Sequence, residues 1–249
     1  MGQKASARIT DAERATLARD VRGRIADIAR TNFPCDPIVV DDASLAASEI
    51  SSAYKRHGLI LEKALLVALG TRTDLTAWTD RIAIASRPKP IQIDLLVHSV
   101  QTGALTAYEI KRGFGTQDSE AQHSIKQRLS DLKIALPEYA TSRGLHASAF
   151  DVAVIGYYGR LGTRMGPHRV IDQQGLVHEF DPQTADFVVE VNEYFRHCLL
   201  RQTAPRFARA LQQISEIAAF RDAVGPVEDR GALQLSEFST VHHPWDSLG

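Results

Sequence analysis

The chain has 249 residues, a formal net charge of −1 and two cysteines. Its length suffices for a substantial hydrophobic core, as one large domain or as a core with helical additions. The near-neutral charge excludes nucleic-acid binding through a basic field over the whole molecule, so any such affinity must come from a local patch.

The cysteines and the hydropathy indicate the cellular compartment and whether the protein associates with a membrane. Cys35 and Cys198 lack the spacing of metal ligands, and we expect them to be reduced thiols of a cytoplasmic protein. No apolar run reaches the length of a membrane span and no signal-peptide core is evident. We therefore expect no membrane partner.

The first part of the chain is predicted to be helical. Residues 11–31 form a charged amphipathic helix, which the segment 32–37 interrupts with two prolines. A second helix covers about 43–56. A third covers about 59–69 and is ended by Gly70.

Glu62 is an unusual residue in the third helix. Plotted at 100° per residue, it lies among Leu65, Leu66 and Leu69 on an apolar stripe. A carboxylate there is costly to bury without a partner. Two interpretations stay open: an ion pair with a basic neighbour such as Arg56, or a role in a metal site.

Three strands are predicted next, over 78–85, 91–97 and 105–112. Asp94 lies in the middle of the second strand, where aspartate is disfavoured. Alternation of the second strand defines two faces, one with Gln92, Asp94 and Leu96 and the other with Ile91, Ile93, Leu95 and Val97.

Glu109 and Lys111 share one face of the third strand, together with Leu105 and Ala107. If the second and third strands pair as a hairpin, Asp94 and Glu109 come within reach of one ion. Their oxygens suit Mg²⁺ or Mn²⁺ rather than zinc. Two carboxylates about 4 Å apart repel by roughly 4 kcal/mol at an effective dielectric of 20, and Lys111 alone offsets only part of this. The alternative is a solvated cross-strand charge pair.

A helix over 119–139 follows, with a buried stripe of Ile125, Leu129, Leu132 and Leu136. Gln122 and Lys126 border one edge of the stripe and Arg128 the other. The segment 131–133 repeats the acid-x-lysine pattern, but a helix does not aim both groups together. We therefore interpret it as a chance match.

A fourth strand is predicted over 151–157, followed by a loop over 159–167 that is rich in glycine and arginine. Glycines let a loop approach a phosphate backbone closely, and arginine suits phosphate contacts. We expect nucleic acid to contact the basic residues of this region: Arg160, Arg164, His168, Arg169 and, on the preceding helix, Lys126. An ordinary solvated loop is the alternative.

The rest of the chain is predicted to contain a short strand near Val170, a turn at 173–175, helices over 184–200 and 205–220, and an irregular tail. We expect an N-terminal helical extension over 1–42, a core over 43–180 and C-terminal helices with the tail over 181–249. These parts are expected to pack together as one domain.

Together these residues resemble the PD-(D/E)XK nucleases. In that family an acid-bearing helix precedes three strands, of which the second and third carry Asp and (Asp/Glu)-x-Lys, and a helix and a further strand follow. Here the matching residues are Glu62, Asp94 and the run from Glu109 to Lys111. The match spans about 100 residues, and the proline of the motif is replaced by Ile93.

The resemblance implies an α/β fold with a restriction-endonuclease-like core (αβββαβ, a mixed sheet flanked by helices) and additional terminal helices. It implies that Asp94, Glu109, the carbonyl of Ile110 and Glu62 bind Mg²⁺ or Mn²⁺, and that Lys111 orients the attacking water. Gln122 is the candidate for a further contact near the phosphate.

The implied reaction is hydrolysis of phosphodiester bonds in DNA, in restriction, defence or repair. A catalytically silent domain that binds nucleic acid or a protein partner is the main alternative, because a fold does not establish activity. DNA against RNA, and the oligomeric state including a homodimer, stay open.

Overall fold

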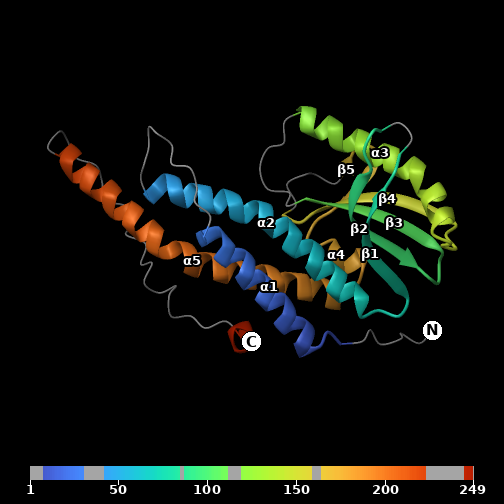
Figure 1. Cartoon of the computed structure of the whole chain (residues 1–249), viewed down its shortest axis with the longest axis horizontal. Coiled ribbons are helices and arrows are strands. Elements are labelled where there is room, and N and C mark those ends of the chain that lie inside the picture. The colour runs from blue at the N-terminus through green and yellow to red at the C-terminus, as the bar shows by residue number, and fades with distance from the viewer. Residues whose placement is uncertain are drawn as a thin grey trace. The chain divides into compact units, whose positions relative to one another are not determined.

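The computed structural model describes residues 8–30, 42–84, 87–111, 119–158, 164–222 and 244–248 (Figure 1). The chain divides into two compact units, each made from two separate stretches of sequence. The first lies within residues 1–13 and 58–191, and the second within 14–57 and 192–249. From the sequence, the boundaries of the core were predicted after residue 42 and after residue 180.

Two long helices continue from one unit into the other. These are α2 (Asp42–Gly70) and α5 (Pro182–Asp222). Each was expected to be two helices, broken near residue 57 and before Pro205. The expected breaks are absent, because one glycine costs a helix only about 1 kcal/mol and one proline removes one hydrogen bond and often bends a helix without ending it.

A mixed six-stranded sheet forms the centre of the first unit, in the order β1-β2-β3-β4-β6-β5. The strands are β1 (Leu75–Ile82), β2 (Ile91–Ser99), β3 (Ala104–Lys111), β4 (Ala149–Gly156), the two-residue β5 (Arg164–Met165) and β6 (His168–Ile171). The first three are antiparallel neighbours, β3, β4 and β6 run parallel, and β5 is antiparallel to β6. The predicted α/β fold with a mixed sheet flanked by helices is confirmed.

One face of the sheet is covered by α3 (Ser119–Ser142), which connects β3 with the parallel β4 (Figure 1). Leu129, Leu132 and Leu136 of α3 are buried in the core on this face. Their partners include Leu105 and Ala107 of β3 and Val152 and Val154 of β4. The predicted helix stripe is thus confirmed, and Leu105 and Ala107 share one face of β3 as predicted.

The opposite face of the sheet is buried as well. Tyr108 of β3 is 4% exposed, its ring lies 5.4 Å from that of Phe180, and its hydroxyl donates to Glu179 Oε1 at 2.6 Å. Glu179 ends the short helix α4 (Leu176–Glu179), in the region where only a turn was expected. Helices therefore flank the sheet on both sides.

The second unit is helical. It contains most of α1 (Asp11–Arg30), the first part of α2 and the second part of α5. His57 Nε2 lies 2.7 Å from Asn192 Oδ1, and Arg22 donates to the Tyr194 hydroxyl at 3.0 Å. The tail was expected to be irregular, but its described part is a 3₁₀ turn, Pro244–Ser247, that buries Trp245.

Cys198 is a free, partly buried thiol of this unit, and burial raises its pKa. Cys35 lies outside the described residues. No helix in the described ranges is long and apolar enough to span a membrane.

Candidate active site

A bulge in β2 sets the position of Asp94. Along the β1–β2 ladder Trp78 pairs with Leu96 and Asp80 with Ile93, so two steps along β1 match three along β2. Such a bulge shifts the alternation of a strand and is frequent next to active sites. The predicted division of β2 residues between its two faces is therefore wrong. Ile93 and Leu96 were expected on opposite faces, but both are buried in the core that also contains α3 residues.

The β2–β3 ladder ends beside this bulge. Its last pair is Leu95 with Tyr108. Just beyond it, Asp94 Oδ2 accepts the main-chain N–H of Ile110 at 2.8 Å. Burial raises the pKa of the Asp94 carboxyl, and the charge of the nearby Glu109 raises it further. The structure thus brings these two carboxylates together where the two strands stop pairing.

Glu109 is held by two cations in a buried position. Its side chain is 2% exposed, with Oε1 2.6 Å from Lys111 Nζ and Oε2 3.0 Å from Arg128 Nη2. Arg128 also donates to the carbonyl oxygen of Gln92 on β2. Both cations oppose the rise in the Asp94 pKa. Two positive side chains therefore balance the two carboxylates.

Arg128 was placed by the sequence only at the edge of the helix stripe. A signal for its burial was present, because Arg128 is three residues after Ile125 and four before Leu132, and such residues lie on the same face of a helix. The expectation that carboxylate repulsion needs a bound cation counted Lys111 alone. With Arg128 included, the protein itself supplies that charge.

Glu62 lies partly buried on α2. Among the described residues, no three Asp, Glu, His or Cys side chains gather closely enough to hold a metal ion. Glu62 therefore does not complete a ready three-carboxylate cluster with Asp94 and Glu109, and its role as a ligand stays a prediction. Gln122 is exposed near the beginning of α3, and its role also stays a prediction.

The residues predicted to contact nucleic acid lie in different environments. Lys126 is partly buried, and its side chain lies beside Gly166 of the β5–β6 turn. Arg160 lies outside the described residues, and of Arg164 only the main chain is described, in β5. His168 and Arg169 belong to β6 rather than to an open loop.

His168 and Arg169 are engaged within the first unit. His168 is 4% exposed, with Nε2 3.2 Å from Ser130 Oγ, and burial together with Lys133 lowers its pKa. Arg169 pairs with Glu179 at 2.5 Å and with Asp151 at 3.1 Å. Both side chains thus have partners within the unit, although Arg169 stays 46% exposed, and their contact with nucleic acid stays a prediction.

The helical acid-x-lysine segment behaves as expected of a chance match. Asp131 pairs with Arg87 at 2.7 Å, whereas Lys133 lies 3.4 Å from Asp151. The two side chains thus have different partners, unlike Glu109 and Lys111.

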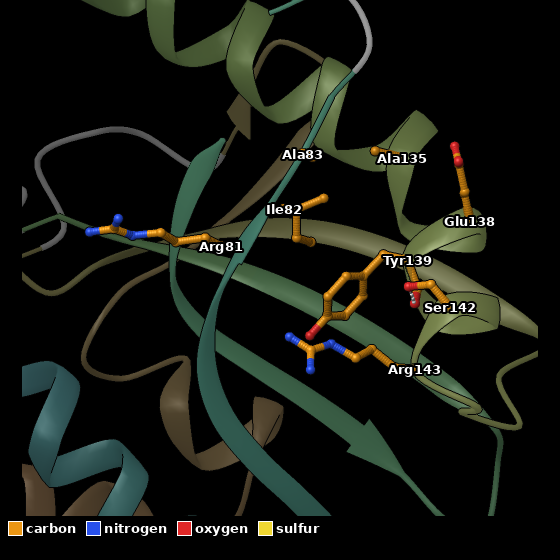
Figure 2. A pocket seen from close by; sticks show the side chains of 8 residues that line it. All are labelled: Arg81, Ile82, Ala83, Ala135, Glu138, Tyr139, Ser142 and Arg143. Carbon is orange, nitrogen blue, oxygen red and sulfur yellow. Dashed lines mark hydrogen bonds between the residues drawn. The ribbon is translucent and has the colours of Figure 1, made fainter. Parts of the chain in front are cut away.

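A pocket of about 270 Å³ lies between β1 and the second half of α3 (Figure 2). Tyr139 and Arg143 lie side by side in it, while Arg81 extends away from them (Figure 2). Tyr139 donates to Asp80 Oδ2 at 2.7 Å and accepts from Trp78 Nε1 at 3.0 Å, and Arg143 pairs with Asp80. This paired network ties α3 to the edge strand.

Comparison with family models, with curated proteins and with solved structures gives no match for this chain.

Proposed function

We propose that the first unit is a Mg²⁺- or Mn²⁺-dependent nuclease of the PD-(D/E)XK type, which hydrolyses phosphodiester bonds in DNA during restriction, defence or repair. One observation carries the proposal. Asp94, Glu109 and Lys111 meet where β2 and β3 stop pairing, next to a bulge that interrupts the regular strand.

The donor atoms fit a hard cation. Asp94 and Glu109 offer carboxylate oxygens, and Ile110 a main-chain carbonyl, while Mg²⁺ typically binds one or two carboxylates and keeps several waters. Glu62 remains the candidate for a further ligand. When bound, such an ion lowers the pKa of a water ligand and neutralises charge that develops on a phosphate.

The side chains around the carboxylates have separable roles in this proposal. Lys111 holds a positive charge 2.6 Å from Glu109 and can orient a water beside it. Ile110 fixes the Asp94 carboxylate through its N–H. Arg128 adds a guanidinium that can bind a phosphate oxygen.

The second candidate function is a silent nuclease-like domain that binds nucleic acid or a protein. It is favoured by one observation, the pairing of both Glu109 oxygens with the protein's own cations. In such a site the protein's own cations offset the charge of Glu109 without a metal ion.

Cleavage of plasmid DNA distinguishes the two. The purified protein should nick DNA with Mg²⁺ or Mn²⁺ and not with chelator. Glu109→Gln and Lys111→Ala should each lower the rate by at least about 10²-fold, because they remove a metal ligand or a charge beside the reacting water.

Asp131→Asn is the matched control, since it alters the same motif on a helix. It should cleave at nearly the wild-type rate. An inactive Asp131→Asn beside a fully active Glu109→Gln would show that the site is misassigned. Absent cleavage would favour the silent domain, and cleavage that persists with chelator would contradict both candidates.

A further inference from the structure

Arg128 has features that its ion pair with Glu109 alone does not explain. Its guanidinium touches Glu109 Oε2 at 3.0 Å and the carbonyl oxygen of Gln92. Its Nε is a buried donor that has no hydrogen-bond partner among the described residues. Arg128 thus has an anchor on β2 that does not depend on Glu109, and a buried donor that is still unpaired within the described ranges.

A divalent ion and these cations compete for the same oxygens. Lys111 Nζ is 2.6 Å from one oxygen of Glu109 and Arg128 Nη2 is 3.0 Å from the other. A metal that binds Glu109 must displace a cation or lie close to it, and like charges at such separations repel by several kcal/mol at the dielectric of a protein surface. While Lys111 and Arg128 both pair with Glu109, their charges therefore oppose the binding of a metal ion.

A phosphodiester has the opposite preference. Its anionic oxygens accept hydrogen bonds from guanidinium and ammonium groups, and arginine offers a bidentate fork. If Arg128 and Lys111 turn from Glu109 to a phosphate, the carboxylate is released and becomes available to a metal ion. The Gln92 carbonyl can keep Arg128 at the site during this exchange.

We propose that Arg128, together with Lys111, exchanges Glu109 for a phosphate of the nucleic acid, so that substrate and divalent metal each raise the affinity of the other. The inference rests on the proposed function and specifies how the site is regulated. Arg128 keeps the metal site closed until it binds a phosphate of the substrate. By linkage, the two ligands must change each other's affinity by the same factor.

Mn²⁺ binding, measured by titration calorimetry or electron paramagnetic resonance, tests the exchange without reference to cleavage. The wild type should bind Mn²⁺ weakly alone and about tenfold more tightly with a short phosphorothioate DNA duplex, within the usual range of coupling between sites. Binding of Mn²⁺ to the duplex alone is subtracted.

Arg128→Gln should bind Mn²⁺ about tenfold more tightly than the wild type without DNA, and DNA should add little more, because a competing cation is gone. Lys111→Gln should also bind Mn²⁺ more tightly than the wild type. This variant replaces Arg128→Gln in the test if a melting experiment shows that Arg128→Gln does not fold. Arg87→Gln removes an arginine that pairs with Asp131 and should behave as the wild type.

Equal Mn²⁺ affinity of the wild type and the folded cation variants would overturn the exchange, even if DNA is cleaved. Coupled binding without cleavage would leave the exchange intact and reject the nuclease activity. Absence of Mn²⁺ binding in every variant, with and without DNA, would reject both.

Discussion

Asp94 and Asp131 are aspartates of one unit whose pKa values move in opposite directions. Burial and the neighbouring Glu109 raise the pKa of Asp94 above its usual 3.8. Burial alone would also raise the pKa of Asp131, but hydrogen bonds from Arg87 and Gln127 outweigh it and lower the pKa. The two residues should therefore give the fold opposite dependences on pH.

Asp94→Asn should raise the melting temperature of the metal-free protein at pH 7. An acid whose pKa is higher in the folded chain destabilises the fold above that pKa, and this cost disappears as the pH falls below the unfolded value. The gain over the wild type should therefore vanish as the pH falls toward and below about 4.

Asp131→Asn is the comparison. Its lowered pKa means that the charged form stabilises the fold above the unfolded value, and this contribution is lost as the pH falls through the folded pKa. The variant should melt slightly below the wild type at pH 7 and match it in acid. A lower melting temperature for Asp94→Asn at pH 7 would show that Asp94 is a stabilising ion-pair member.

The sequence could predict much of the site, but only from residues close together along the chain. Glu109 and Lys111 were assigned to one face from their spacing, and the hairpin brought Asp94 near them. The bulge at Asp94 was not predictable from alternation, since one extra residue is visible only against the partner strand. The partnership of Arg128 with Glu109 required the packing of α3 on the sheet.

Among the elements, α3 depends on a polar network at its C-terminal half as well as on its leucine stripe. The Tyr139 hydroxyl bridges Trp78 and Asp80 of β1, and its hydrogen bond is the main cause of the lowered pKa of Asp80. A hydrogen bond to a charged group contributes about 1.5–3 kcal/mol. The network therefore fixes the helix across the edge strand.

Tyr139→Phe should lower the free energy of unfolding by about 1–3 kcal/mol, because it removes this bond and leaves Trp78 Nε1 without its acceptor. Denaturant titration measures the change. Tyr158→Phe, at a tyrosine that is 38% exposed, is the control and should change stability by less. Equal effects of the two substitutions would contradict a structural role of the network.

Element types were easier to predict than the places where helices end. Strands β1 to β4 and helix α3 followed from short periodic runs, whereas the two-residue β5 lies in the segment predicted to be a loop. Helix α2 ends at Gly70 as expected. The expected interruptions of α2 and α5 relied on Gly58 and Pro205. The preference of one glycine or proline against helix is small compared with the burial of apolar side chains before and after it in the helix. The identity of that one residue does not reveal this burial.

At the scale of the molecule, the boundary of the first unit at residue 191 can be tested with fragments. Ala185, Phe187, Val188 and Val191 are buried residues at the beginning of α5. Full burial of a large apolar side chain contributes about 1.5–3 kcal/mol, and a whole domain is stable by only about 5–15 kcal/mol. A fragment over 58–191 should therefore unfold cooperatively on heating, followed by circular dichroism, whereas one over 58–180 should not.

Cooperative melting of both fragments with the same midpoint would support the boundary expected from sequence, at 180. A cooperative transition only in the longer fragment would support the boundary inside α5.

The division of each unit between two stretches of chain has a consequence for the order of events during synthesis. Residues 14–57 leave the ribosome before any strand of the sheet, but their partners in the second unit begin only at residue 192. The entire sheet is made in between. The early helices must therefore wait, with apolar faces such as that of Ile28 still without their final partners, until most of the chain has emerged. We expect this interval to be when the nascent protein is most prone to aggregation.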